Sequence, residues 1–333
     1  MIVPRVVVVG AGMVADLHIR AARTGHHLEI VGFLDTDEAR RANRSAEWQI
    51  PSLDSLADAL ADQKVDGILV LTPVESHAEI AVQALSAGKH VFIEKPVASR
   101  EEIKVIAEAA ASSGKVCFPG HNYAYDSHFT QLRSLVQSGE LGTLRALFIH
   151  YVIAHPEEVA RHYGGVLGEV MIHHAYLTVA LLGRPSHITA GTSEPQWAEH
   201  DAEDQAWMTW EYPGGLTVHL FATFAVNDDS MAPWMFTVKA LGTNGSSSYE
   251  WKSSTFRRAL GSLSFAIPAY ENSYIYEHEA FAAAIGGDPT RIVSSIEDAL
   301  LTQELIDLAH ESARTGSRCR VGEEIRVANG RSK

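Results

Sequence analysis

A lysine and a proline stand directly after a short apolar run, His90–Ile93, which predicts a buried strand. Lys95 then falls at the carboxyl end of that strand, the edge at which open α/β sheets bind ligands. Pro96 cannot donate a ladder hydrogen bond and restricts Lys95 to an extended conformation, so the strand ends there and the lysine is held at the edge. Short motifs also match by chance, and a solvated lysine in a turn is the alternative.

A glycine-rich turn near the N-terminus predicts a phosphate-binding site. The β-branched run that ends at Gly10 is typical of a central parallel strand, and a helix is expected to follow. Gly10 permits the tight turn, Gly12 lets the backbone approach a pyrophosphate, and the small Ala15 allows close packing of helix on strand. Met13 and Val14 open the helix, whose unpaired N–H groups suit phosphates. The motif is weak alone, but here it has the required strand before it and helix after it.

An acidic residue ends the second predicted strand, residues 28–34. Asp35 lies about 20 residues past the glycine turn, where a carboxylate binds both ribose hydroxyls of a dinucleotide. A carboxylate there repels a 2′-phosphate, so the sequence favours NAD over NADP. The alternative role for Asp35 is to cap the next helix, in which Arg40 and Arg41 are expected to face solvent.

Polar residues also follow the third predicted strand. Thr72 and Pro73 end it, and His77 stands at the start of the next helix. The position of His77 beside Thr72 and Pro73 points it at the cofactor, although it could simply exploit the helix N-terminus. Capping boxes are expected at Ser76–Glu79 and at Ser99–Glu102.

The pattern of the first half and the composition bound the class of protein. Strand and helix patterns alternate six times, which predicts a doubly wound parallel sheet. The chain has 333 residues, enough for about two domains, and a formal net charge of −14, which argues against nucleic acid or an anionic membrane as a partner. No apolar run is long enough to span a bilayer and no secretory pattern is present, so a cytoplasmic location is expected. Two cysteines suggest a reduced protein.

The combined motifs, together with Ala-Gly-Lys-His-Val-x-x-Glu-Lys-Pro over residues 87–96, resemble the Gfo/Idh/MocA oxidoreductase family over essentially the whole chain. The resemblance implies a Rossmann domain, residues 1–122, that binds a nicotinamide cofactor, with Glu94, Lys95 and Pro96 near it. It also implies a C-terminal α+β domain, residues 123–333, with an open, mostly antiparallel sheet. The face of that sheet often forms oligomers in the family, so a homodimer or homotetramer is expected.

The resemblance includes a second glycine-rich turn and the helix that follows it. Glu169 and His173 match the family's Asp-x-x-x-His and, being four apart, share one helical face. The family implies that both line the substrate pocket and that His173 accepts a proton, with His174 as an alternative. Tyr176 stands where a further Asp is common. A surface Glu–His pair without chemistry is the other interpretation.

The link between the two domains carries two further candidate substrate contacts, Asn122 and Tyr123. Family members often have an Asn followed by an Arg two residues later, and here Ala124 takes the place of the Arg. Together with Glu169 and Tyr176, this change implies an altered substrate pocket.

Strand patterns dominate the rest of the second half. Hairpins are expected over residues 207–224 and 236–251. Residues 268–273 are expected to form a loop that closes over the substrate, and a capping box at Ser294–Glu297 to begin a last helix that packs back on the first domain. Several aromatic side chains suggest an apolar sheet face for a homo-oligomer: Trp207, Trp210, Phe221, Phe224 and Trp234.

These residues favour a dehydrogenase. Hydride transfer from a carbinol carbon to nicotinamide requires loss of the hydroxyl proton, which His173 suits, while Lys95 stabilises the charge on the oxygen. We therefore expect an NAD-dependent enzyme acting on CH–OH groups of a sugar, cyclitol or related polyol. A non-catalytic cofactor sensor is one alternative, but such a protein would have less need for both Lys95 and His173. A metal-dependent enzyme using His150, His155, His162 and His173 is another, but no metal-binding motif is present, so no metal site is predicted.

Overall fold

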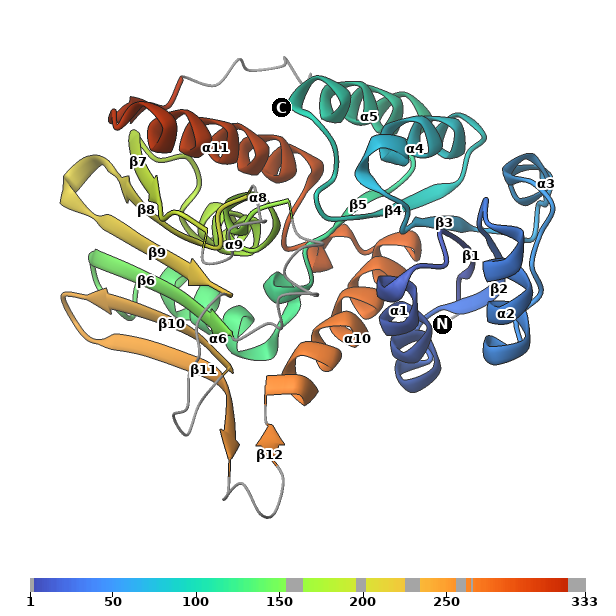
Figure 1. Cartoon of the computed structure of the whole chain (residues 1–333), viewed down its shortest axis with the longest axis horizontal. Helices are drawn as coiled ribbons and strands as arrows, with labels where there is room; N and C mark the ends of the chain where they lie inside the picture. Colours follow the sequence, from blue (N-terminus) through green and yellow to red (C-terminus); the bar gives the residue numbers. More distant parts are fainter. Residues whose placement is uncertain are drawn as a thin grey trace.

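The computed structural model describes residues 3–153, 164–195, 202–224, 234–255, 262–264 and 266–322, which form two sheets joined by helices (Figure 1). His155 and His162 lie outside these ranges. The first sheet occupies the N-terminal third of the chain and the second sheet most of the remainder. The predicted boundary at residue 122 falls between them, within the short helix η2 (Asn122–Tyr125).

The first sheet is parallel, with strand order β2-β1-β3-β4-β5. Its strands are β1 (Arg5–Val9), β2 (Glu29–Leu34), β3 (Gly67–Val70), β4 (His90–Glu94) and β5 (Cys117–Gly120). The helices between them are α1 (Met13–Gly25), α2 (Glu38–Trp48), α3 (Leu56–Ala61), α4 (His77–Ser86) and α5 (Arg100–Ser113). The doubly wound parallel sheet is confirmed, but the sixfold alternation was wrong, because five strands form this sheet.

The second sheet has strand order β12-β11-β10-β6-β9-β8-β7-β13, and its described pairs are antiparallel except β6 with β9. Both predicted hairpins are confirmed. The strands are β6 (Leu144–Ile153), β7 (His187–Thr192), β8 (Gln205–Glu211), β9 (Thr217–Thr223), β10 (Trp234–Gly242), β11 (Ser246–Thr255), β12 (Ser262–Ser264) and β13 (Cys319–Arg320). Its helices are α6 (Ser127–Gln137), α8 (Val166–Glu169), α9 (Met171–Leu182), α10 (Ala266–Ile285) and α11 (Ile296–Thr315).

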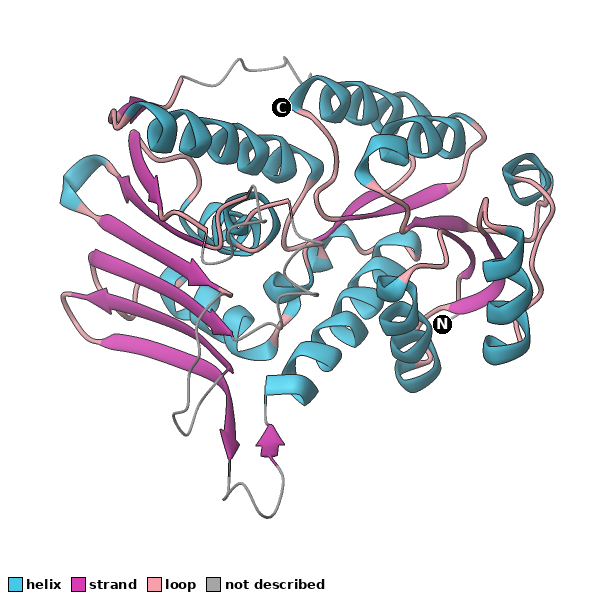
Figure 2. Cartoon of the chain, viewed as in Figure 1, coloured by secondary structure: helices cyan, strands magenta, loops and turns pink. Residues whose placement is uncertain are grey.

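The helices of the second half lie on one side of this sheet, as Figure 2 shows for the described residues. Strand side chains alternate between the two faces, so neighbouring aromatic residues differ in burial. Trp210 and Phe224 are fully buried on the helix-covered side, whereas Trp207 is 45% exposed and Phe221 half-buried on the other. Of the aromatic residues named for the sheet face, Trp210 and Phe224 therefore lie on the helix-covered side.

The long helix α10 runs between the two halves and packs along α1 (Figure 1). It includes residues 268–273, so the prediction of a loop there was wrong. Pro268 lies in the first turn of α10, where a residue without an N–H is tolerated because those N–H groups have no helical partner.

The last helix, α11, packs on α5 of the first half and also on α9 and β7. Its capping box is formed by Ser295 and Asp298, one residue beyond the predicted pair. The Ser99–Glu102 box is present as predicted. Ser76 makes no cap hydrogen bond, because its hydroxyl donates to Thr72 and to the Pro73 carbonyl, so the Ser76–Glu79 box was wrong.

Cys117 and Cys319 are both free thiols. Within the described ranges, every helix is too short or too polar to cross a bilayer.

Candidate active site at the edge of the parallel sheet

The glycine turn joins β1 to α1 at the carboxyl edge of the first sheet. Gly10 has φ +101°, and a Cβ there would lie 2.6 Å from the carbonyl oxygen of Leu71, so only glycine fits against the neighbouring strand. Gly12 precedes the helix, and a Cβ built on it would meet no atom within 4 Å. Its side of the turn is therefore open, as an approaching phosphate requires. No side chain caps the first N–H groups of α1, while Ala15 is fully buried between helix and sheet.

The carboxylate of Asp35 is held at the end of β2 by several donors. It accepts the N–H groups of Ala11 and Asp37, each at 2.8 Å, and the Arg40 guanidinium lies 3.2 Å away. Burial disfavours the charged form of Asp35, but the two N–H groups and Arg40 outweigh it and hold its pKa below the ordinary value. The cap of α2 is Asp37, whose side chain accepts the N–H of Arg40, so Asp35 is not the helix cap.

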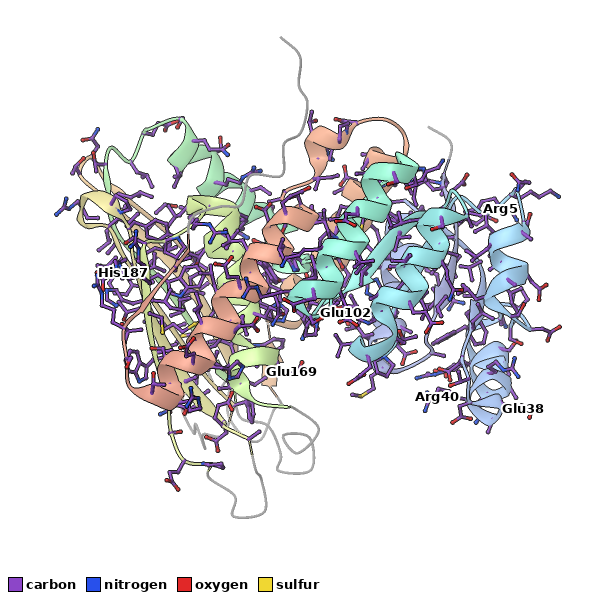
Figure 3. All side chains as sticks on the ribbon, turned by 90° about the horizontal axis from the view of Figure 1, so that it is seen from above. Arg5, Glu38, Arg40, Glu102, Glu169 and His187 are labelled. Atoms are coloured by element: carbon purple, nitrogen blue, oxygen red, sulfur yellow. The ribbon has the colours of Figure 1, made fainter. Side chains whose placement is uncertain are left out.

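Arg40 faces solvent, as expected, and its guanidinium is also an ion-pair partner of Asp35. Its guanidinium stays about half exposed while it contacts the carboxylate. Figure 3 shows Arg40 and Glu38, both on α2, at the end of the first half that lies away from the second sheet.

The His77 ring contacts the backbone of two turns at the carboxyl edge of the first sheet. Its Nε2 lies 2.7 Å from the carbonyl oxygen of Thr72, and its Nδ1 lies 3.1 Å from the carbonyl oxygens of both Pro96 and Val97. Because His77 is buried, with both ring nitrogens engaged by the backbone, it shapes the turn that follows β3 and the turn that carries Lys95. Pro73 precedes the first of these turns, and the Lys95–Pro96 peptide bond is cis.

Glu94, the last residue of β4, faces into the protein. One of its oxygens accepts the backbone N–H of Lys95 at 2.6 Å, and the other lies 3.3 Å from Nε2 of His18 on α1. The Nδ1 of His18 lies 2.9 Å from Nε2 of His278 on α10. These buried contacts connect the helix after the glycine turn, the long helix α10 and the backbone of the lysine.

The side chain of Lys95 reaches across to the second half of the chain. Its ammonium donates to the backbone carbonyl of Glu169 at 3.1 Å and lies 3.4 Å from the Glu169 carboxylate. Both side chains keep part of their surface exposed, 20% for Lys95 and 33% for Glu169. Glu169, labelled in Figure 3, lies between the two halves. A lysine and a carboxylate from the two predicted domains therefore meet at one accessible point.

His173 lies one helical turn beyond Glu169, on α9. Its ring stacks on Tyr123 with centroids 4.2 Å apart, and its Nδ1 lies 2.7 Å from the hydroxyl of Tyr176. Burial and the nearby positive charge of Lys95 hold the pKa of His173 well below its ordinary value. His173 is therefore neutral at pH 7, as a proton acceptor must be.

His174 belongs to the core instead. It is fully buried against Tyr151 and Phe236 of the second sheet, and neither of its ring nitrogens has a hydrogen-bond partner among the described residues. Burial lowers its pKa to about 3. Consecutive helical residues point about 100° apart, so when His173 borders the site, His174 faces the sheet.

The three other predicted substrate contacts lie behind His173. Asn122 and Tyr123 are 2% and 3% exposed, and Tyr176 is fully buried. The Tyr176 ring stacks flat on His121, whose centroid is 4.1 Å away. These residues therefore pack around His173, and very little of their surface is accessible to a ligand.

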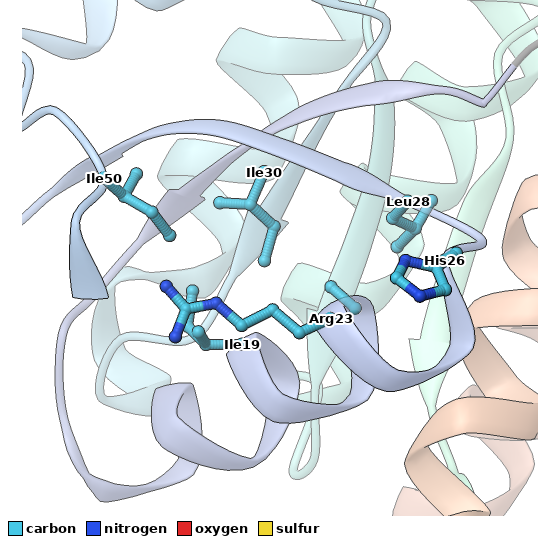
Figure 4. A pocket seen from close by; sticks show the side chains of 7 residues that line it. Ile19, Arg23, His26, Leu28, Ile30 and Ile50 are labelled. Atoms are coloured by element: carbon cyan, nitrogen blue, oxygen red, sulfur yellow. The ribbon is translucent and has the colours of Figure 1, made fainter.

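Sequence reasoning missed several residues that complete this arrangement, namely His18, His278, His121 and Ser273. They come from parts of the chain far apart in sequence, and no local pattern marks them. The hollow in Figure 4, with a volume of about 260 Å³, lies elsewhere, at the end of α1 away from the glycine turn. It is lined mainly by apolar side chains with Arg23 and His26.

The described residues contain no group of three or more His, Cys, Asp or Glu side chains that could hold a metal ion. The edge does fit a dinucleotide: an open glycine turn, an uncapped helix start and a fixed carboxylate follow one another at the ends of β1 and β2. The chemistry that this cofactor supplies when bound is hydride acceptance or donation by its nicotinamide.

The site and fold define an oxidoreductase of the Rossmann class. The family model described as "Oxidoreductase family, NAD-binding Rossmann fold" matches residues 4–121, and the "GFO/IDH/MocA C-terminal domain" matches residues 129–248. The chain belongs to the Gfo/Idh/MocA family. The predictions of this family, of an NAD-dependent dehydrogenase and of NAD as the cofactor are confirmed.

Relatives with printed activities include dehydrogenases of cyclitols. The scyllo-inositol 2-dehydrogenase (NAD(+)) of Bacillus subtilis (strain 168) is 26% identical over 275 residues, 78% of either chain. The inositol 2-dehydrogenase 3 of Saccharopolyspora erythraea is 36% identical over 155 residues, 46% of this chain and 45% of its own. The structure of scyllo-inositol dehydrogenase from Lactobacillus casei with NAD(H) and scyllo-inositol has a TM-score of 0.82 at 16% identity, covering 96% of this chain and 99% of that one.

Proposed function

We propose that the protein oxidises a CH–OH group of a sugar, cyclitol or related polyol, or reduces the matching ketone, with NAD as the hydride carrier. The observation that carries the proposal is the contact of Lys95 with Glu169 at the carboxyl edge of the NAD-binding sheet, one helical turn before a neutral His173. The cyclitol dehydrogenases among its relatives support the substrate class.

In this proposal, Lys95 and His173 act on the same substrate oxygen. Lys95 donates a hydrogen bond to the oxygen and stabilises its developing negative charge as hydride leaves the adjacent carbon. His173 takes the hydroxyl proton on its free Nε2 in the direction of oxidation and returns it in the direction of reduction. Glu169 positions the Lys95 ammonium through its carbonyl and carboxylate oxygens.

The cofactor is proposed to lie along the edge of the parallel sheet. Gly10, Gly12, Met13 and Val14 give it a turn and helix start for the pyrophosphate, and Asp35 binds the ribose hydroxyls. The turns of Thr72–Pro73 and Glu94–Pro96 border the nicotinamide end. We propose that His77 acts here by fixing those two turns, since its ring is buried.

A cofactor sensor without catalysis is the second candidate. It needs the glycine turn and Asp35 but not a lysine and a neutral histidine held together, and we therefore favour the enzyme. A screen decides between them: the protein is incubated with NAD and a panel of cyclitols and sugars, and formation of reduced cofactor is followed by absorbance. We expect turnover of at least one polyol, and loss of that turnover in Lys95→Met. Tight NAD binding without turnover of any compound would favour the sensor.

We also propose that the outer face of the second sheet joins two copies of the chain. Trp207 is exposed there and Phe221 is half-buried directly across from it, while Phe148 and Met235 are half-buried further along the same face. Within the described part of the chain no helix covers this face (Figure 2). Exposed and half-buried apolar side chains on an uncovered sheet face are typical of a protein interface.

A further inference from the structure

The hydroxyl of Tyr176 lies at the centre of a buried hydrogen-bond chain that ends on His173. It accepts the backbone N–H of Tyr123 at 3.1 Å, and it lies 2.7 Å from Nδ1 of His173 and 3.4 Å from Oδ1 of Asn122. A tyrosine hydroxyl has one proton to donate. That proton goes either to His173 or to Asn122, and the choice determines which nitrogen of His173 carries the imidazole proton.

The far end of the chain fixes the orientation of Asn122. The hydroxyl of Ser273 donates to the backbone carbonyl of Tyr270 at 2.6 Å, so its own proton is used. Ser273 can therefore only accept from Asn122, which places the Asn122 amide nitrogen at 2.9 Å from it. The Asn122 carbonyl oxygen then faces Tyr176 and needs a donor there, because a buried amide oxygen without a donor is destabilising.

Only one assignment gives the buried oxygen of Asn122 a donor. Tyr176 donates to the oxygen of Asn122, and Nδ1–H of His173 donates to the oxygen of Tyr176. The alternative, in which Tyr176 donates to Nδ1, leaves the Asn122 oxygen without a donor. In the satisfied arrangement Nε2 of His173 keeps its lone pair, and this atom has no hydrogen-bond partner among the described residues.

We propose that Asn122 and Ser273 are positioning residues that act through the Tyr176 hydroxyl to keep the proton of His173 on Nδ1 and its Nε2 free to accept a proton. The inference rests on the proposed function for its catalytic meaning, but the tautomer itself is a property of the free protein. It also gives Tyr176 a role. Because its hydroxyl donates to Asn122, it can only accept from His173, and this keeps the proton on Nδ1.

The tautomer is measured directly by nitrogen NMR of protein labelled in its histidines, with the His173 signals assigned by their absence in His173→Gln. We expect the Nδ1–H form in the wild type. In Asn122→Leu the Tyr176 proton has no other acceptor and goes to Nδ1, so the signals should change to the Nε2–H form. A wild type with Nε2–H, or an Asn122→Leu variant that keeps Nδ1–H, would overturn the proposal.

Two further variants keep the test decisive if Asn122→Leu does not fold. Tyr176→Phe retains the ring stacked on His121 and removes only the hydroxyl, so His173 should show a mixture of tautomers. Ser273→Ala frees the Asn122 amide to turn. His173 should then also show both tautomers, with a smaller share of the Nε2–H form than in Tyr176→Phe. Tyr212→Phe is the matched control, because it removes another tyrosine hydroxyl, a partly buried one that donates to the Gly183 carbonyl. A single Nδ1–H form in Tyr176→Phe or Ser273→Ala would also overturn the proposal.

Turnover provides the second readout once a substrate is known. Asn122→Leu and Tyr176→Phe should each lower kcat about tenfold to a hundredfold, the usual loss when a group that orients a functional histidine is removed. The Kd for NAD should stay unchanged. Adding Tyr176→Phe to Asn122→Leu should cause no further loss, because both act on one chain. A fully active His173→Gln would refute the proposed function but leave the tautomer result intact, so the two failures are distinguishable.

Discussion

At the proposed ribose end of the cofactor site, the Asp35 carboxylate accepts two N–H hydrogen bonds and pairs with a guanidinium. Asp35 is therefore a fixed negative charge, and Arg40 is a partly exposed positive charge that Asp35 neutralises. We expect the affinity for a cofactor with a 2′-phosphate to depend on the charges of both side chains, not on Asp35 alone.

Asp35→Ser should strengthen NADP binding about tenfold or more, because it removes the repulsion and frees Arg40 to pair with the phosphate. The same change should weaken NAD binding. Titration of each cofactor by protein fluorescence gives the two dissociation constants. Adding Arg40→Ala should abolish the gain for NADP. An equal gain with and without Arg40 would show that the arginine takes no part.

Histidines also bear on stability against acid. The Nδ1 of His90 accepts the backbone N–H of Val116 at 3.1 Å, and burial with the nearby Lys115 lowers the pKa of His90 to about 4. Its pKa in the unfolded chain is near 6.5, so the unfolded state binds the proton first. The contribution of a neutral His90 is fully present above about pH 6.5 and is lost as the pH falls towards about 4.

His90→Gln should therefore flatten the loss of unfolding free energy over that pH window, because glutamine can accept from Val116 without titrating. Chemical denaturation at several pH values measures it. His128→Gln is the matched control, since the His128 side chain is 60% exposed. Parallel pH curves for the wild type and His90→Gln would contradict the assignment.

At the scale of elements, the chain offers two serines before helices with different local geometry. Ser99 accepts the N–H of Glu102 and completes a capping box, whereas Ser76 turns back to Thr72. Ser99→Ala should lower the unfolding free energy by about 1 kcal/mol, the typical value of an N-cap. Ser76→Ala should cost less than half of that. Thermal or urea unfolding of both variants checks the difference, and equal losses would contradict the assigned caps.

The elements that could be predicted from the sequence are those determined locally. Apolar runs ending in Gly10, Asp35 and Lys95 predicted parallel strands and the edge at which they end, because burial of a strand and the conformations of glycine and proline act within a few residues. Residues 268–273 were mistaken for a loop because Pro268 marks a break in most contexts, whereas in the first turn of α10 it is tolerated.

The supports of the site could not be predicted, since they depend on tertiary contacts. The partner of Asn122 is 151 residues away in sequence, and that of His18 on α10 is 260 residues away. For the same reason the sequence left His173 and His174 as alternatives. Only the orientation of α9 against the sheet shows that His174 is buried in the core and that His173 stays partly exposed.

At the scale of the whole molecule, α10 and α11 cross from the second half to pack on helices of the first. The two halves are thus connected by helices as well as by the link at residue 122, and the site between them includes a lysine from one and a glutamate from the other. The remaining large surface is the outer face of the second sheet.

Trp207→Arg should break the proposed assembly of two or more copies, because a large exposed aromatic at the centre of an interface commonly contributes about 2 kcal/mol or more, roughly thirtyfold in Kd. Sedimentation velocity at several protein concentrations measures this. Val105→Arg is the control, since Val105 is 52% exposed on α5, away from the sheet. A wild type that is monomeric at micromolar concentration would refute the interface.

The central claim is that Lys95 and His173 act on the reacting oxygen while other residues bind the cofactor. The measurement that tests it most directly is turnover, together with the Kd for NAD, in Lys95→Met and His173→Gln. We predict a loss of about two to four decades in kcat for each, as when an acid–base or oxyanion group is removed, with the Kd for NAD changed at most modestly for Lys95→Met. Normal kcat in either variant would contradict the account, and so would a lost NAD site with intact chemistry.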